Sequence, residues 1–426
     1  MLVLDSRLRL LLFLLVVAAP ALVLMAKTLR VTLAQTWGDS LELNSIQRAI
    51  ALDRGNPQLH YTLGTVYLFG GETTPPALAV EEMRQATVIR PNSARFWSGL
   101  GKACWMAGDQ DCADQAFARA VALAPSSPQY VWDAAVNAAG MRRRGPAISQ
   151  LQNFLRLQPE GYPQAFQLLW RAFGDSGLLW NDLLQPSAGA DVKLACLEFL
   201  GENGRFDLAA EYWAELAAAH PALSFAAAEP YLEELISNAH YPEAVELWRY
   251  LRQSGAVADS PGADPANLVF NGGFEQAPLQ AGFDWRYQPQ PYINVNFADP
   301  AAHRGARALR VDFTVPRNSE FEPVQELAPV APGKTYVLSA YVRSEAITSD
   351  SGPRLRVVDP QCPACLDVAT EAVTGTTNWH EIHVPFTAGP ANSIVRISVW
   401  RLRSRSFPME ISGSAWFDDV ALREAP

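Results

Sequence analysis

The hydrophobic and polar residues follow three different patterns along the chain. Residues 10–26 form an apolar run without a single charge. From about residue 38 to residue 253 the apolar positions follow a helical pattern. Later stretches alternate between apolar and polar residues, most clearly in ALRVDFTV at 308–315. Alternation is typical of strands with one buried face. The chain is therefore predicted to be multidomain, with an all-α part followed by an all-β part.

Residues 94–127 set the register of the helical part. Small Gly101 and Ala113 let two antiparallel helices approach closely, and bulky residues such as Phe117 fill the neighbouring layer. Pro125 ends the second helix because proline has no amide hydrogen and clashes with the preceding turn. In length and residue types this stretch resembles one tetratricopeptide repeat (TPR), a 34-residue helical hairpin.

The same pattern recurs along residues 38–253, where Pro91, Pro125 and Pro159 follow one another at a constant spacing. TPR hairpins stack into a solenoid whose first helices line a concave groove. The resemblance implies a protein partner bound in that groove. The residues expected to contact this partner are Tyr61, Thr65, Lys102, Trp105 and Trp132. The alternative is that these aromatic residues pack between neighbouring repeats.

The N-terminal segment 1–37 has the features of a membrane element. Basic residues flank the apolar run on both sides, and an uncharged run of this length at the start of a chain is typical of a membrane or export segment. A cleaved signal is the alternative. The run continues past Ala19-Pro20-Ala21, and Lys27 and Arg30 precede the next small residues. We therefore favour an uncleaved transmembrane helix, although basic residues at both ends leave its orientation undetermined.

The segment 254–266 is rich in Gly, Pro, Ala and Asp and is predicted to be an interdomain linker. The rest of the chain, 267–426, resembles a jelly-roll sandwich of the galactose-binding-like class, similar to the carbohydrate-binding modules of polysaccharide hydrolases. The motifs that carry this resemblance are NLVFNGGFE, GARALRVDF, APGKTYVLSAYVRS, TNWHEIHVPFTA and AWFDDVAL, in this order. The expected architecture is an all-α TPR solenoid followed by an all-β jelly-roll sandwich.

Carbohydrate binding needs flat aromatic faces together with polar groups for the sugar hydroxyls. Aromatic and polar residues alternate in the stretch FDWRYQPQPYINVN, and a second aromatic residue with a neighbouring arginine ends a later strand. The predicted carbohydrate-binding residues are Trp285, Arg286, Tyr287, Tyr292, Trp400 and Arg401. A surface aromatic residue can also be a packed rim residue, and that alternative stays open.

Two acidic residues lie in motifs that the galactose-binding-like class places side by side around a structural calcium ion. Glu275 and Asp418 would supply carboxylate oxygens, with backbone carbonyls completing the shell. The alternative is that both carboxylates accept hydrogen bonds from loop amides. No other cofactor is expected.

The five cysteines form two close pairs and one isolated residue. Cys104 and Cys112 lie on opposite helices of the hairpin at 94–127, where an oxidising compartment would join them and the cytosol would leave them as thiols. Cys362 and Cys365 form a CPAC motif in a strand-rich domain, which favours a loop disulfide or plain thiols over redox catalysis. Cys196 is expected in the helical core.

Charge and motifs narrow the functional classes. A net charge of -10 argues against a nucleic-acid partner. Neither a phosphate loop nor a dinucleotide fingerprint or nucleophile elbow occurs, so no enzymatic function is expected. We interpret the chain as a bacterial envelope protein with a single-pass anchor in the inner membrane and its bulk on the extracytoplasmic side. The repeats would bind a protein partner and the sandwich would bind surface polysaccharide. The protein would then take part in the synthesis, export or attachment of that polysaccharide. The alternative is a pure protein assembly scaffold with a structural sandwich.

Overall fold

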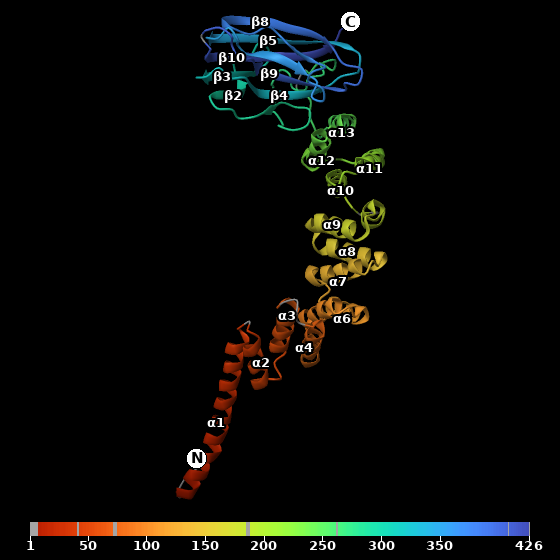
Figure 1. Cartoon of the computed structure of the whole chain (residues 1–426), viewed down its shortest axis with the longest axis vertical. Coiled ribbons are helices and arrows are strands. Elements are labelled where there is room, and N and C mark those ends of the chain that lie inside the picture. Colours follow the sequence, from red (N-terminus) through yellow and green to blue (C-terminus); the bar gives the residue numbers. More distant parts are fainter. Residues whose placement is uncertain are drawn as a thin grey trace. The chain divides into compact units, whose positions relative to one another are not determined.

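The computed structural model describes residues 7–40, 42–70, 75–184, 188–260, 263–407 and 409–425. The chain divides into two compact units, Met1–Pro186 and Ser187–Pro426 (Figure 1). The sequence placed the main boundary in the segment 254–266, where helices give way to strands. The structure instead places it earlier, so that the last four helices belong to the same unit as the sandwich.

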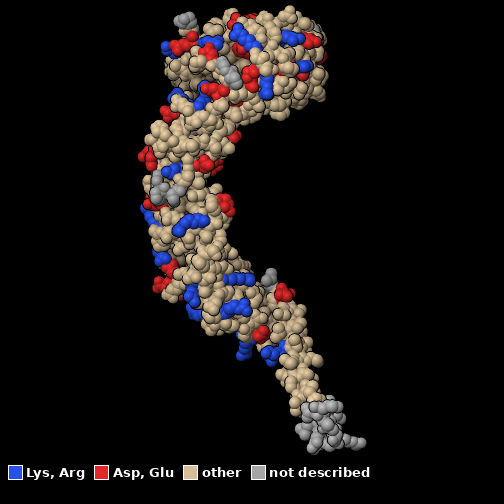
Figure 2. Space-filling view, turned by 180° about the vertical axis from the view of Figure 1, so that it is seen from behind, with Lys and Arg blue, Asp and Glu red and all other residues tan. Residues whose placement is uncertain are grey.

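The first unit begins with the long helix α1 (Arg7–Gly38). Its segment Leu15–Gly38 has a mean hydropathy of 1.6 and is long and apolar enough to cross a membrane, with none of its apolar window buried in the protein. Figure 2 shows an uncharged stretch of this helix before the repeats begin. A transmembrane helix and a signal sequence share these properties.

Helical hairpins of nearly equal length follow α1. Pro91, Pro125 and Pro159 each come two residues after the end of a second helix, which confirms the spacing read from the sequence. Each first helix also lies beside the first helix of the next hairpin. The helices are α2 (Leu43–Leu52), α3 (Pro57–Phe69), α4 (Pro76–Ile89), α5 (Ala94–Met106), α6 (Gln110–Leu123), α7 (Pro128–Gly140), α8 (Arg144–Leu157), a short turn at Pro159–Gly161, α9 (Tyr162–Phe173) and a π-helical turn at Leu178–Leu183.

Close packing within the hairpins explains the small residues of the repeat. A Cβ atom on Gly101 would lie 2.9 Å from the ring of Phe117 on the paired helix. Ala113, on the same helix as Phe117, is fully buried. Any larger side chain at either position would push the helices of the hairpin apart. The predicted TPR-type packing is therefore confirmed at these positions.

The second unit begins with two more hairpins, made of α10 (Ala190–Glu202), α11 (Phe206–Ala218), α12 (Phe225–Ser237) and α13 (Tyr241–Gln253). Their buried residues include Leu197, Trp213 and Leu232. The imidazole of His240 stacks on the ring of Phe206, with ring centroids 3.9 Å apart. The TPR-like pattern therefore continues up to the sandwich.

The sandwich consists of two antiparallel five-stranded sheets, with orders β1-β4-β9-β6-β7 and β2-β3-β10-β5-β8. Apolar side chains from the facing sides of both sheets form one core. The predicted all-β jelly-roll-like architecture is confirmed. The strands are β1 (Arg286–Tyr287), β2 (Ile293–Asp299), β3 (Ala308–Val315), β4 (Phe321–Pro329), β5 (Thr335–Ile347), β6 (Arg354–Val358), β7 (Asp367–Ala369), β8 (Gly375–Thr387), β9 (Ile394–Arg401) and β10 (Ile411–Glu424).

The predicted linker 254–266 is anchored on both sides, apart from residues 261–262, which lie outside the described residues. The side chain of Val257 is buried. Asp264 pairs with Arg423 of β10 at 2.9 Å. These contacts hold the described part of the predicted linker against the second unit.

Helices α12 and α13 pack directly on the sandwich within this unit. The indole of Trp248 on α13 lies 5.2 Å from the ring of Phe270 and 5.8 Å from that of Phe283. Gly282 has a φ of +62°, and a Cβ atom there would lie 2.6 Å from Trp248. Only glycine therefore lets this loop approach the helix so closely.

Candidate functional site

Trp285 is a core residue of the sandwich. Its side chain is fully buried, and its ring lies 5.2 Å from the ring of Phe274. The Asp284 carboxylate fixes the local backbone, because it accepts hydrogen bonds from the amides of Leu279 and Trp285 at 2.7 Å each. A sugar ring needs an exposed aromatic face, so the prediction that Trp285 contacts carbohydrate is wrong.

Arg286 joins the sandwich to helix α12. Its two terminal nitrogens donate to both carboxylate oxygens of Glu233, at 2.7 and 2.8 Å. One of these nitrogens also donates to the carbonyl of Gly282, whose amide donates to Glu233 at 2.7 Å. The terminal guanidinium nitrogens, which the sequence analysis predicted to bind a sugar, already donate hydrogen bonds to groups of the protein. The structure therefore corrects Arg286 from a ligand-binding residue to a structural one.

The two tyrosines of the same stretch lie in different surroundings. Tyr287 lies in β1 and is partly buried against the sandwich core. Tyr292 is 60% exposed and has a φ of +67°. Its carbonyl accepts the amide of Thr314 at 3.0 Å. Their roles in carbohydrate binding stay predictions.

Trp400 lies on the outer face of the sheet β1-β4-β9-β6-β7. Side chains alternate between the two faces of a strand, and Ile397 and Val399 of β9 belong to the sandwich core. Trp400 points outward for that reason and is half-buried. Its indole Nε1 donates to a carboxylate oxygen of Glu320 at 2.8 Å.

Charged and polar side chains surround Trp400 on this face. The guanidinium carbon of Arg356 lies 4.5 Å from the indole centroid and that of Arg354 lies 5.8 Å from it. Arg356 also forms two hydrogen bonds of 2.7 Å with Asp367. Ser398 donates to Glu322. We call this group the Trp400 patch; its members are Glu320, Glu322, Arg354, Arg356, Asp367, Ser398 and Trp400.

Arg401 belongs to the interior and not to the patch. It follows Trp400 in a strand and therefore points to the opposite face. It is fully buried, and its guanidinium donates to the carbonyls of Ser351, Ser319 and Met409 at 2.6–2.9 Å and to the hydroxyl of Ser349 at 3.2 Å. The prediction that Arg401 contacts sugar is wrong, because its guanidinium ties together three loops.

The other sheet carries an aromatic group that the sequence did not single out as a site. The ring of His303 stacks on Tyr341 with centroids 3.7 Å apart and lies 5.7 Å from Trp379. Its Nδ1 lies 2.6 Å from a carboxylate oxygen of Asp419. A polar cavity of about 390 Å³ lies beside Tyr341 and Asp419. The alternation of inward and outward positions in strands β5 and β8 is the sequence signal that could have placed Tyr341 and Trp379 on the outer face of this sheet.

Glu275 and Asp418 both accept hydrogen bonds from loop amides. Glu275 accepts the amide of Ala306 at 2.8 Å, and one oxygen of Asp418 accepts those of His303 and Arg304 at 2.7 and 3.0 Å. Burial raises the pKa of Asp418 to about 6. No group of three or more His, Cys, Asp and Glu side chains among the described residues could hold a metal ion. The amide alternative accounts for both carboxylates, and the calcium ion stays a prediction.

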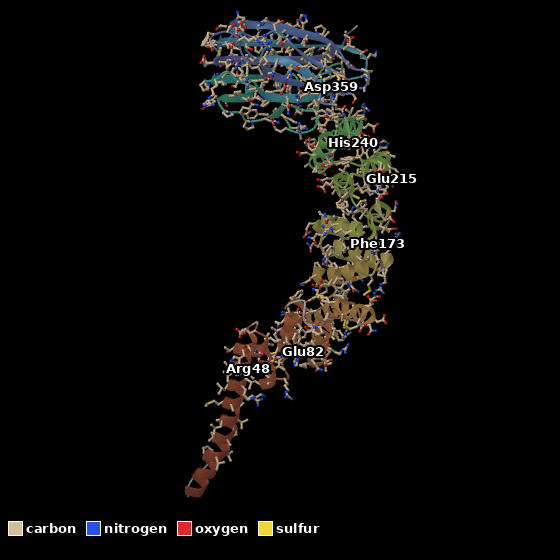
Figure 3. The ribbon with its side chains drawn as sticks, in the orientation of Figure 1. Arg48, Glu82, Phe173, Glu215, His240 and Asp359 are labelled. Carbon is tan, nitrogen blue, oxygen red and sulfur yellow. A yellow bond between two sulfur atoms is a disulfide. The ribbon has the colours of Figure 1, made fainter. Side chains whose placement is uncertain are left out.

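Two buried carboxyl groups lie near the contact between α13 and the sandwich. Glu326 accepts the amide of Phe270 at 2.7 Å. Burial, and then the charge of Asp284, raise the pKa of Glu326 well above its ordinary value. Burial likewise raises the pKa of Asp284 to about 6. Figure 3 marks Asp359 of the sandwich. Burial, and then the charge of Asp359, raise the pKa of Tyr241 on α13.

The first helices of the repeats are tied to one another by polar side chains. Lys102 on α5 forms an ion pair with Asp133 on α7, with 2.8 Å between Nζ and Oδ2. Ser98 donates to the same carboxylate oxygen at 2.7 Å. Thr65 donates to the carbonyl of Tyr61 in its own helix at 2.9 Å. These three contacts stabilise the repeats, while the role of Lys102 and Thr65 toward a partner stays a prediction.

The aromatic residues predicted for the groove differ in exposure. The ring of Tyr61 lies 5.4 Å from that of Phe96 on the next first helix, as the packing alternative expects. Trp105 is 49% exposed. Trp132 lies 5.0 Å from Phe154 and also lines an open cavity of about 400 Å³ with residues of α9. Trp105 and Trp132 can therefore still contact a partner.

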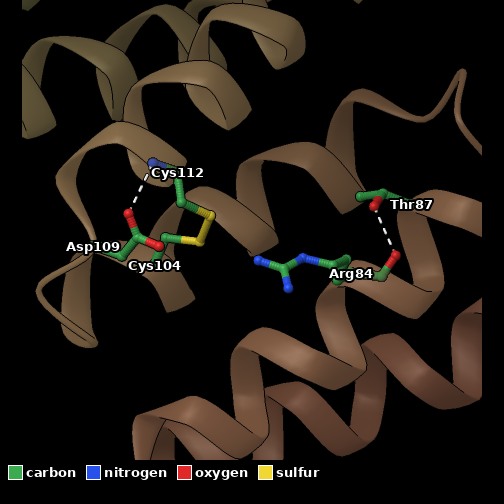
Figure 4. The surroundings of a disulfide bond; sticks show 5 residues. All are labelled: Arg84, Thr87, Cys104, Asp109 and Cys112. Carbon is green, nitrogen blue, oxygen red and sulfur yellow. Dashed lines mark hydrogen bonds between the residues drawn. A yellow bond between two sulfur atoms is a disulfide. The ribbon is translucent and has the colours of Figure 1, made fainter.

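Both close cysteine pairs are joined. Figure 4 shows the disulfide between Cys104 and Cys112, next to Asp109, whose carboxylate caps α6 by accepting the amide of Cys112 at 3.1 Å. The second disulfide joins Cys362 to Cys365. Cys196 is free and buried, and burial raises its pKa to about 12.

No family model matches the chain, and no curated protein matches it. Among solved structures it is similar to the MamA protein, with 19% identity over 50% of this chain and 94% of MamA and a TM-score of 0.31. It is also similar to YrrB, a TPR protein with an unusual peptide-binding site, with 17% identity over 45% of this chain and 89% of YrrB and a TM-score of 0.31.

A carbohydrate-binding module, TmCBM61 in complex with β-1,4-galactotriose, is similar as well. The identity is 19%, over 37% of this chain and 99% of the module, and the TM-score is 0.26. Likeness at these identities and scores concerns the type of fold and says nothing about ligands.

Proposed function

We propose that the protein is a non-enzymatic scaffold whose helical repeats bind a protein partner and whose sandwich binds carbohydrate. The observation that carries the carbohydrate part is the Trp400 patch. It sets one half-buried aromatic side chain among hydrogen-bonding arginine and glutamate side chains on an outward sheet face. Binding sites for sugars combine an aromatic contact with a few placed polar groups, and this patch offers both.

The repeats support the protein-binding part. Trp105 is half-exposed, and Trp132 lines an open cavity of about 400 Å³ together with Leu168 and Arg171. Tryptophan and arginine are enriched where proteins bind one another, since they combine apolar area with hydrogen bonding. A protein or peptide partner would insert an apolar side chain beside Trp132.

Helix α1 would anchor the protein in the inner membrane of a bacterial envelope, with both units on the extracytoplasmic side. The exposed apolar surface of Leu15–Gly38 supports the anchor, and the two disulfides support an oxidising compartment. An anchored protein that binds both a partner and a glycan fits a role in synthesis, export or attachment of surface polysaccharide.

A glycan array probed with the full chain in non-ionic detergent tests the carbohydrate part. Trp400→Ala removes the patch aromatic while leaving the core intact, and Phe69→Ala is the matched control, because it removes a 74% exposed aromatic side chain from the helical repeats. Specific binding that only Trp400→Ala abolishes would support the proposal. Absence of binding to every glycan would leave the second candidate, a pure protein scaffold, which the packed α12–α13 contact with the sandwich favours.

A further inference from the structure

The loops next to the Trp400 patch carry Arg317, Arg403 and Arg405. Three loops meet there: residues 316–320, 348–353 and 402–410, of which residue 408 lies outside the described residues. Asn318 and Ser404 lock two of them together, because each accepts a hydrogen bond of 2.8 Å from the other. The buried guanidinium of Arg401 binds acceptors in all three loops. We call this group the three-loop cluster.

Three arginines of the three-loop cluster point into solvent. Arg317, Arg403 and Arg405 are exposed, and among the described residues none of them has an ion-pair partner within reach. Arg403 and Arg405 follow Trp400 by three and five positions, so the loop leaves the sheet at the patch itself. The cluster therefore presents unpaired positive charge at the end of the sheet where Trp400 lies.

Arg354 adds a second, independent observation. It lies in β6 opposite Trp400, and its Nε is buried with no hydrogen-bond partner among the described residues. Its Nη2 donates to the Ser351 hydroxyl at 3.4 Å, and burial lowers its pKa. A partly buried cation with an unused donor and no bound carboxylate is costly, and an anionic ligand group would satisfy it.

Acidic groups near the cluster do not cancel these charges. Glu320 accepts from the Trp400 indole and Asp350 accepts from the Ser404 hydroxyl. The arginines of the patch and the loops number six, namely Arg317, Arg354, Arg356, Arg401, Arg403 and Arg405, and the acids number five, namely Glu320, Glu322, Asp350, Asp367 and Glu410, which leaves one positive charge in excess. The rest of the protein carries the opposite sign, since the whole chain has a net charge of -10. A polyanion would be repelled by the chain as a whole and attracted to this local excess of positive charge.

We propose that the ligand of the Trp400 patch is an acidic polysaccharide, whose carboxylates bind Arg354 and the exposed arginines of the three-loop cluster. This proposal rests on the proposed function, because it names the class of glycan for the same site. Trp400 contacts the sugar ring, Arg354 donates hydrogen bonds to a carboxylate beside it, and Arg403 and Arg405 bind the next acidic residues of the polysaccharide. Guanidinium groups suit this task because their paired N–H donors match the geometry of a carboxylate.

The test compares polygalacturonate with fully methyl-esterified polygalacturonate, which has the same backbone without the charge. The full chain in non-ionic detergent is titrated with each polymer by calorimetry. We expect binding of the acidic form that weakens about tenfold in the Arg403→Gln, Arg405→Gln double variant. It should also weaken with added salt, because salt screens exposed ion pairs. Arg304→Gln removes a 75% exposed guanidinium elsewhere on the sandwich and should leave the affinity unchanged.

The possible outcomes separate this proposal from the proposed function. Equal binding of both polymers, unchanged in the double variant but lost in Trp400→Ala, would overturn the acidic class and keep carbohydrate binding. Binding of neither polymer would overturn the acidic class too, and the neutral glycans of the array would then decide whether any carbohydrate function remains. Binding to phosphatidylserine vesicles instead, abolished by Phe407→Ala, would assign the loops to a membrane surface and overturn the proposal.

Discussion

The contact between Glu233 and Arg286 should couple the last helical hairpin to the sandwich energetically. The pair has two charge-assisted hydrogen bonds of 2.7 and 2.8 Å. The side chain of Glu233 is 30% exposed and that of Arg286 is 23% exposed. Removing one partner of a fully buried pair costs about 3–5 kcal/mol, whereas exposed pairs are worth below about 1 kcal/mol. For this intermediate burial we expect about 2 kcal/mol for Glu233→Ala and for Arg286→Ala alone.

Differential scanning calorimetry of both single variants and the double variant measures the coupling. At roughly 2–4 °C per kcal/mol for a unit of this size, each single variant should lower Tm by about 4–8 °C. The double variant should be little worse than either single one, which corresponds to a coupling free energy of about 1–2 kcal/mol. Lys334→Ala breaks the more exposed pair with Glu424 and serves as the control. Additive shifts in the double variant would refute the reasoning.

Three further predictions follow from burial, charge and covalent links. Trp285→Ala should lower the free energy of unfolding by about 3–5 kcal/mol because its ring is fully buried, while Trp400→Ala should cost much less; urea denaturation compares them. The folded-state pKa of Asp284 is raised to about 6, so its contribution to stability is present below pH 3.8 and lost as pH rises to about 6. The free energy of unfolding, measured between pH 4 and 7, should fall as pH rises. In the Asp284→Asn variant it should fall less. Replacing Cys104 and Cys112 by serine should lower the free energy of unfolding by about 2–3 kcal/mol, because the unfolded chain gains conformational entropy without the disulfide. A thermal scan in which the variant has the same Tm as the oxidised protein would contradict this.

The helical part could be predicted well because its signals are local. Pro91, Pro125 and Pro159 each follow closely on the end of a second helix. Gly101 is needed because a neighbouring ring leaves no space for a Cβ atom. The strands were equally readable, since ALRVDFTV became β3 with the expected alternation of buried positions. Both kinds of signal act within one hairpin or one strand, so the sequence contains them directly.

The candidate site was only partly predictable, because its residues depend on contacts distant in the sequence. Trp285 and Arg286 look alike as surface candidates in a loop segment, yet one enters the core and the other meets Glu233, 53 positions earlier. Trp400 and Arg401 are a different case. Strand alternation alone rules out that both face one ligand, and applying it would have kept Trp400 and removed Arg401.

The anchored junction of α13 with the sandwich has a mechanical consequence. A polymer pulled away from the sandwich would load Trp248, Phe270 and the Glu233–Arg286 pair instead of stretching a slack connector. Tension would then pass straight into the helical hairpin α12–α13. A pulling force on the bound polymer would therefore strain the packed junction inside the second unit.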